Sequence, residues 1–130
     1  MQEIKSEHEL LAEAMSRLGK RFAACRKAAG RRSDSVDAFA SAAATQLVDL
    51  DPGQLPVAAH TIWTDKVARP LKADAAKPLS PPNIAALRSW PAARLRQLIR
   101  ALAEIEQIVR ETEIDARNEI VRATISREYS

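Results

Sequence analysis

The chain has 130 residues with a formal net charge of +3, and 46% of its residues are apolar while 28% are charged. A chain of this size can bury roughly two thirds of the surface that its unfolded form exposes, so we expect one folded domain over residues 1–130. No stretch approaches the roughly 18 apolar residues of a membrane span, and the first residues lack a signal-peptide pattern, which argues against a membrane protein.

The first predicted helix spans about residues 6–29. Ser6 and Glu9 have capping-box spacing, in which each side chain accepts from the other residue's backbone amide. Apolar residues then recur at steps of three and four and share one stripe, which carries Leu11, Met15, Leu18, Phe22, Cys25 and Ala29. Gly30 is the expected C-cap, because glycine adopts a positive φ without steric cost.

Two further helices are predicted before residue 70. Asp34 is expected to cap the second, whose apolar face carries Val36, Phe39, Ala43, Leu47 and Leu50. The sequence Asp51-Pro52-Gly53 predicts a turn with Gly53 in the left-handed region. Pro56 suits the first turn of a third helix through Val67. Pro70 should stop that helix, because it disfavours the helical conformation for Arg69.

Residues 70–82 hold four of the seven prolines and predict a loop, with at most one helical turn over 73–76. Ser80 is the expected cap of a short helix over 83–90. Pro91 then opens a long helix whose apolar residues again step by three and four, at Leu95, Leu98, Leu102, Ile105 and Val109. Thr112 to Asp115 predicts a new cap and a last helix, but no Gly or Pro forces a break there. One long helix over 91–127 is therefore the alternative.

Strand signals are nearly absent from the sequence. The expected fold is all-α: a single-domain antiparallel bundle of about five to six helices with a proline-rich loop at 70–82. In this fold the 11–29 and 95–109 stripes are buried against each other.

The sequence lacks the residue patterns of the common catalytic and metal sites. Three glycines give no phosphate-binding loop, and neither His-Glu-x-x-His nor Cys-x-x-Cys occurs. His8 lies in a polar first turn and His60 within a predicted helix, with nothing to place them together. Cys25 lies on an apolar stripe, where burial raises a thiol pKa and makes it inert. We expect no enzyme, no metal, no cofactor and no small-molecule substrate. A lone cysteine and an initial Met indicate a complete cytoplasmic protein.

Charge is segregated along the chain. The net charge is +4 over residues 1–32, −5 over 33–65, +7 over 66–100 and −3 over 101–130. The first basic set lies on the first predicted helix, opposite its apolar stripe, and consists of Arg17, Lys20, Arg21, Lys27 and Arg31. The second lies around the proline-rich loop and on the long helix after it, and consists of Lys66, Arg69, Lys72, Lys77, Arg88, Arg94, Arg96 and Arg100, of which all but Lys77 and Arg88 are candidate binding residues.

Two such basic surfaces suit contacts to phosphates, which give sequence-independent, salt-sensitive affinity. Trp63 and Trp90 border the second set, where an exposed ring could stack on an unpaired base. The alternatives are that both tryptophans belong to the core and that the basic helix face is an ordinary solvated surface.

Two families show a resemblance. Trp90-Pro-Ala-Ala-Arg-Leu95, followed by Leu98, Leu102-Ala-Glu104 and Glu106, resembles the C-terminal collar domain of bacterial DNA polymerase III delta subunits over about 40 residues. The chain departs from that family at 110–112, where Arg-Glu-Thr replaces a Lys-containing turn, and it lacks the ATPase-like domains that precede the collar. In general character, as a small, basic, all-helical chain, it is similar to the small subunits of CRISPR effector complexes.

The preferred prediction is a non-catalytic subunit that holds a nucleic-acid backbone within a ribonucleoprotein assembly, as the CRISPR resemblance implies. Its expected partners are RNA or single-stranded DNA and other protein subunits, including copies of itself, with no membrane partner. The collar resemblance implies the alternative, an oligomerisation domain of a clamp loader that binds protein rather than nucleic acid.

Overall fold

The computed structural model describes residues 5–30 and 35–129. Helices hold 80% of these residues, and none of them lies in a strand, which confirms the all-α prediction. The five α-helices are α1 (Glu7–Ala29), α2 (Ser35–Gln46), α3 (Val57–Ile62), α4 (Pro81–Ala85) and α5 (Ala92–Tyr129). Three short elements join them, the 3₁₀-helices η1 (Pro52–Gln54) and η3 (Ala86–Ser89) and the π-helix η2 (Trp63–Ala68).

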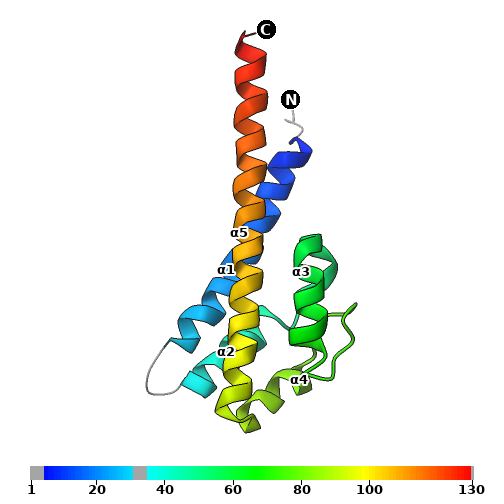
Figure 1. Ribbon diagram of the computed structural model, residues 1–130, viewed down its shortest axis with the longest axis vertical. Helices are drawn as coiled ribbons and strands as arrows, with labels where there is room; N and C mark the ends of the chain where they lie inside the picture. Colours follow the sequence, from blue (N-terminus) through cyan, green and yellow to red (C-terminus); the bar gives the residue numbers. More distant parts are fainter. Residues whose placement is uncertain (1–4, 31–34, 130) are drawn as a thin grey trace.

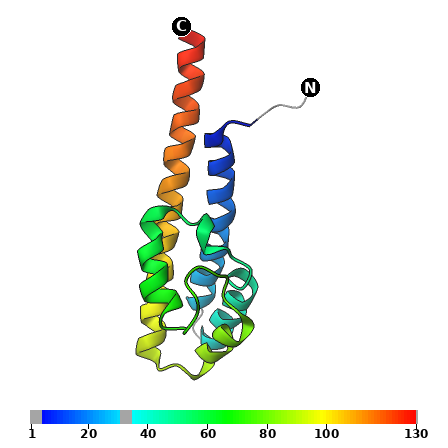
Figure 2. The same ribbon diagram turned by 90° about the vertical axis from the view of Figure 1, so that its right-hand side faces the viewer.

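The antiparallel pair of α1 and α5 forms the long axis of the molecule (Figure 1). Their apolar stripes meet in the core, where Phe22 on α1 and Ile105 and Val109 on α5 are at most 1% exposed. The short helices cover the lower part of this pair, so the upper part of α5 rises clear of them (Figure 2). No helix in the described ranges is long and apolar enough to cross a membrane.

Helix α1 begins as the capping box predicts. The Glu9 amide donates to the Ser6 hydroxyl oxygen, and the Ser6 amide donates to the Glu9 carboxylate, both over 3.2 Å. Two details of the prediction are wrong. Gly30 is the C-cap of α1 as predicted, but its φ is −80° rather than positive, because its amide donates to the Arg26 carbonyl in helical geometry. Leu11 is 40% exposed and lines a surface groove together with Leu50 and Gln54 instead of lying in the core.

Helix α5 runs without a break for 38 residues, so the long-helix alternative is correct and the predicted cap at residues 112–115 is wrong. The Thr112 hydroxyl donates to the Ile108 carbonyl, 2.8 Å away, within the helix instead of capping a new one. The hydroxyl of Thr112 is therefore bonded to the preceding helical turn and does not cap a following helix.

Two further predictions, for residues 53 and 69, are wrong. Gly53 does not take a positive φ, because it lies in a 3₁₀ turn that the bond from the Gln54 amide to the Asp51 carbonyl closes, with the Asp51 carboxylate accepting the Gly53 amide hydrogen as the cap. Arg69 stays helical (φ −60°, ψ −50°) although it precedes Pro70. The chain reverses three residues later, at Lys72, whose φ is 56° and whose amide bonds to the Arg69 carbonyl.

The proline-rich loop is confirmed over most of its predicted length. Residues 73–76 form a turn rather than a helix, and Asp74 accepts the amide hydrogen of Ala76. Ser80 precedes α4 as predicted, with its amide donating to the Asn83 side chain over 2.9 Å. The predicted cap of α2, Asp34, lies outside the described residues.

A candidate nucleic-acid groove

A surface groove of about 600 Å³ lies between η2 and the first half of α5. Its cationic lining comes from two parts of the chain: Lys66 and Arg69 from η2 and the turn after it, and Arg94 and Arg100 from α5. Two carboxylates, Asp65 and Glu104, line the same groove. The groove therefore gathers four members of the predicted second basic set and has an excess of positive charge.

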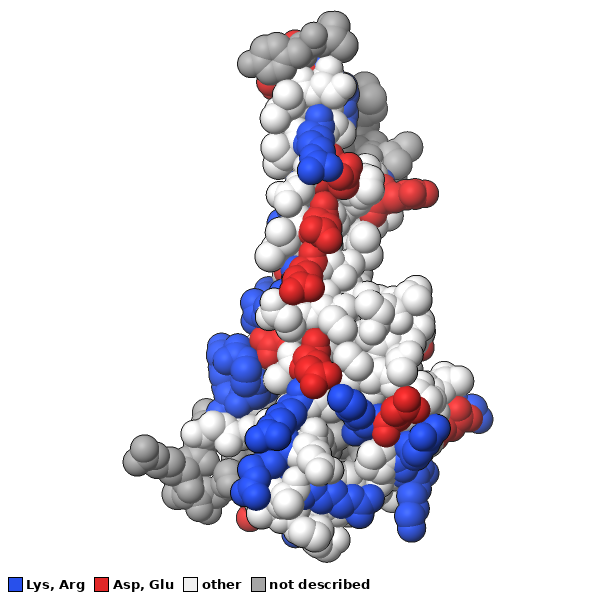
Figure 3. Space-filling view, viewed as in Figure 1, with Lys and Arg blue, Asp and Glu red and all other residues white. Residues whose placement is uncertain are grey.

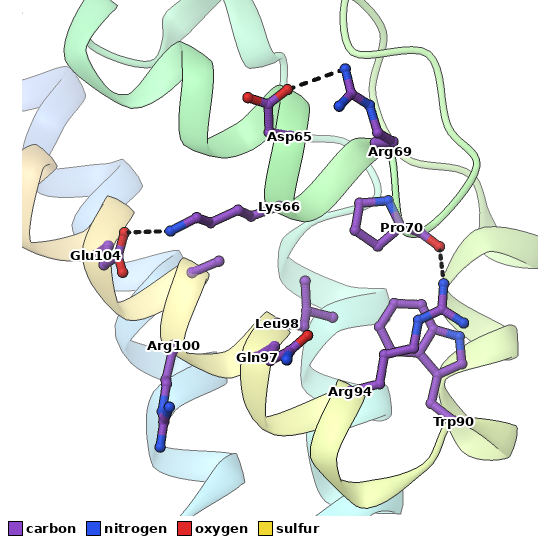
Figure 4. A pocket seen from close by; sticks show the side chains of 11 residues that line it. Asp65, Lys66, Arg69, Pro70, Trp90, Arg94, Gln97, Leu98, Arg100 and Glu104 are labelled. Carbon is purple, nitrogen blue, oxygen red and sulfur yellow. Dashed lines mark hydrogen bonds and ion pairs between the residues drawn. The ribbon is translucent and has the colours of Figure 1, made fainter.

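Three of the four cations have partners within the groove (Figure 4). Lys66 Nζ lies 3.6 Å from a Glu104 carboxylate oxygen, and an Arg69 guanidinium nitrogen lies 3.3 Å from an Asp65 carboxylate oxygen. All four of these side chains are 46% exposed or more, so water screens both pairs. Arg100 is exposed and makes no hydrogen bond or ion pair with any residue that the structure describes.

Arg94 is the most firmly held cation of the groove. Its guanidinium carbon lies 4.1 Å from the centre of the Trp90 ring, and a guanidinium nitrogen donates to the Pro70 carbonyl over 2.8 Å. A cation over an indole face is attracted by the ring quadrupole, and the carbonyl fixes its direction. Together they hold a planar cationic group at the groove wall.

The two tryptophans differ in their surroundings. Trp63 is 1% exposed and belongs to the core, so its predicted role in base stacking is wrong and the core alternative is correct. Its indole nitrogen is buried and has no hydrogen-bond partner among the residues that the structure describes. Trp90 is half-buried, with one ring face under Arg94, and lines the groove. The helical packing of η2 turns Trp63 inward, while Trp90 lies just before α5 at the surface.

The first basic set is divided by the structure. Arg17 and Arg21 line a second groove, of about 400 Å³, together with Asp49 and Asp51. Arg21 also donates to the Gln46 carbonyl over 3.3 Å, so it is directed toward an acidic part of the surface.

Lys20 and Lys27 are exposed and have no hydrogen-bonding or ionic partner in the described part of the chain. Arg31 lies outside the described residues. Of the second set, Lys72 and Arg96 are exposed but do not line the groove. Fewer of the predicted basic residues therefore share one surface than the sequence suggested.

On the face in Figure 3, most of the Lys and Arg side chains lie on the wide lower body, whereas a column of Asp and Glu, with a basic side chain above it, follows the projecting part of α5. On this face the basic and acidic side chains are therefore partly separated in space. A polyanion approaching this face would be attracted to the lower body and repelled higher up.

One ionic cluster was missed by the sequence-based prediction. The Glu106 carboxylate is 5% exposed, and it accepts from Arg26 on α1 and from Arg110 on α5, each over 2.9 Å. Burial raises the pKa of this carboxyl, but the hydrogen bonds and charges of the two guanidinium groups outweigh it and lower the pKa overall. The four-residue spacing to Arg110 was a usable signal, whereas the contact with Arg26 spans 80 residues.

Cys25 lies beside this cluster. Burial, and then the negative charge of Glu106, raise the pKa of its thiol to about 12. His60 contacts the Leu55 carbonyl through Nε2 at 2.8 Å, and His8 is exposed. Within the described ranges no three His, Cys, Asp or Glu side chains are grouped as metal ligands.

No family model, curated protein or solved structure matches this chain. The resemblances to CRISPR small subunits and to the clamp-loader collar therefore stay predictions.

Proposed function

We propose that this chain is a non-catalytic subunit that binds the phosphate backbone of single-stranded RNA or DNA in the groove between η2 and α5. The observation that carries the proposal is the convergence of Lys66, Arg69, Arg94 and Arg100, which come from segments about 30 residues apart, on one groove. A backbone binder needs several cations along one path, because each phosphate contact releases counterions and adds to the affinity.

The ion pairs already present in the groove are compatible with this role. Exposed pairs contribute little to stability, typically about 0–1 kcal/mol, so Lys66 and Arg69 can exchange a carboxylate for a phosphate at small cost. Asp65 and Glu104 moderate the affinity, which suits a subunit that holds a strand together with other subunits.

Arg94 is proposed to contact the nucleic-acid strand with the flat face or the edge of its planar guanidinium group. Guanidinium groups stack on unpaired bases and also donate to phosphates, and Trp90 keeps this one flat against the wall. Trp90 then acts through Arg94, since the ring face that a base would meet is already covered.

The test compares two double variants that remove the same charge. Arg69→Ala with Arg100→Ala alters the groove, whereas Lys5→Ala with Arg127→Ala alters exposed cations at the opposite end of the molecule. Binding to labelled oligouridine and oligothymidine is measured by fluorescence anisotropy at several salt concentrations. The groove variant should bind all sequences more weakly, and its salt slope should be smaller by about 0.7 for each phosphate that it no longer neutralises. The control should bind as the parent does.

Equally weakened binding in the two variants would contradict a groove-specific role. A third variant, with Arg17, Lys20, Arg21 and Lys27 all changed to Ala, measures what the α1 set adds. Because Arg17 and Arg21 face Asp49 and Asp51, we expect a smaller decrease in affinity per charge than in the groove variant.

The proposed setting is a ribonucleoprotein assembly of the CRISPR effector type, in which such a subunit lines a nucleic-acid path beside other proteins. The alternative, a clamp-loader collar domain, binds protein and ignores nucleic acid. A parent protein that binds neither oligonucleotide at low salt, alone or within an assembly that co-purifies with it, would favour the collar.

A further inference from the structure

The projecting part of α5 has an apolar stripe that none of the other described helices covers. Ile114 is 56% exposed, Val121 is 55% exposed and Ile125 is 49% exposed. Their spacings of seven and four residues place all three within about 20° of one line along a helix of 3.6 residues per turn. Ala116, which is buried, faces the opposite way, toward the core side of α5. The stripe therefore points away from α1.

Charged residues flank this stripe in a definite order. On one side, about 80–100° around the helix from Ile114, lie Asp115 and Arg122. On the other side, about 40° away, lie Arg110 and Glu128. Arg110 and Arg122 have intrahelical partners, Glu106 and Glu119. Asp115 and Glu128 make no ion pair with any other residue that the structure describes.

We infer that a second copy of this chain packs antiparallel against the stripe, with a two-fold axis between residues 119 and 120. A two-fold axis perpendicular to both helices brings like flanks together and pairs residues equally distant from the axis. Ile114 then lies opposite the partner's Ile125, and Val121 lies opposite the partner's Asn118. Both ends of the interface are apolar.

Charge complementarity favours a second copy as the occupant. On one flank Asp115 comes within reach of the partner's Arg122, which lies opposite residue 117 and therefore two residues further along the helix. On the other flank Arg110 comes within reach of the partner's Glu128. Each pairing occurs twice by symmetry, and both of the unpaired carboxylates gain a cation.

The opposite orientation is less favourable. In a parallel, in-register pair the unlike flanks face each other, as in parallel coiled coils. Arg117 lies about 60° from Ile114, on the same side as Arg110. In the parallel pair it faces the partner's Arg122, and this like-charge contact, which occurs twice, offsets the attraction between Arg110 and the partner's Asp115. In the antiparallel pair Arg117 faces only the partner's Arg117, and that contact occurs once. The antiparallel arrangement also directs the two wide bodies away from each other, because the stripe belongs to the projecting end of α5.

Disulfide cross-linking of the full-length chain tests both the partner and the orientation. Ile114→Cys and Ile125→Cys are made separately, mixed in equal amounts and oxidised. The antiparallel pair predicts a cross-linked dimer in the mixture and little in either variant alone, since two copies of one position lie about 16 Å apart along the axis. Cross-linking of each variant with itself would indicate the parallel pair and overturn the proposal. The native Cys25 is buried and serves as an internal control.

Charge reversal provides a second test that leaves the core untouched. Asp115→Arg alone and Arg122→Asp alone each place like charges at both symmetric pairings, so each should shift sedimentation equilibrium toward the monomer, by about tenfold or more in dissociation constant. An equimolar mixture of the two variants matches every charge and should recover the parent's association. Circular dichroism confirms that each variant is folded. A parent that is monomeric at every concentration, or variants that associate as the parent does, would overturn the proposal.

Discussion

Replacing Glu106 by Gln tests how the one carboxylate that is buried among the described residues contributes to stability. The parent's two oxygens each accept from a guanidinium group over 2.9 Å. A glutamine keeps one carbonyl acceptor but sets its amide group against the second guanidinium. The variant thus loses about one charge-assisted bond, worth about 1.5–3 kcal/mol when shielded from water. Because both arginines are about half exposed, we expect a smaller loss, about 1–2 kcal/mol at pH 7.

The loss should depend on pH with a definite sign. The folded-state pKa of Glu106 is lowered, so the carboxylate stabilises the fold above its unfolded pKa of about 4.3. That contribution disappears as the pH falls through the folded pKa, because the folded carboxyl then binds a proton as well. The difference in free energy of unfolding between parent and variant should therefore shrink toward zero in acid.

Urea unfolding followed by circular dichroism at pH 7 and in steps down to about pH 3 measures this difference. Glu104→Gln is the matched control on the same helix, since Glu104 is 51% exposed and its contact with Lys66 is 3.6 Å long. The control should change stability by less than about 0.5 kcal/mol at any pH. A Glu106 difference that stays constant or grows in acid would refute the account of its ion pairs.

Two further predictions concern the core. Burial holds the pKa of Cys25 at about 12, so its thiol should react with a thiol reagent at pH 8 only after unfolding; rapid labelling of the native protein would contradict this. Leu102→Asp should abolish the helical circular-dichroism signal, since it loses about 1.5–3 kcal/mol of transfer free energy and also buries a charge, while the exposed neighbour Ala103→Asp should leave the fold intact. A folded Leu102→Asp variant would show that the α1–α5 interface is not the core.

The long helices could be predicted because their signal repeats over many turns. Five apolar residues of α5, from Leu95 to Val109, are all at most 5% exposed. Single-residue signals were less informative. Gly30 and Gly53 were expected to have a positive φ. Their amides instead donate to the Arg26 carbonyl and the Asp51 carboxylate, and neither hydrogen bond requires a positive φ. Glycine permits a positive φ but does not require it, so its presence alone does not predict one.

The groove could be predicted only in part. The sequence indicates a basic region around the proline-rich loop, and the groove draws four of its cations from that region. It does not indicate which cations meet, because that depends on how η2 packs on α5. The same packing buries Trp63 and leaves Trp90 at the surface, although both tryptophans border the loop in sequence. The contact between Arg26 and Glu106 has no local signal at all.

The most direct test of the proposed function is the salt dependence of single-strand binding by the parent protein. If the four groove cations each contact one phosphate, the logarithm of the binding constant should fall with that of the salt concentration with a slope of about −3. Between 50 and 200 mM salt this corresponds to a decrease in affinity of roughly 50-fold for both RNA and DNA. No detectable binding at 50 mM salt, or binding that is independent of salt, would contradict the proposal.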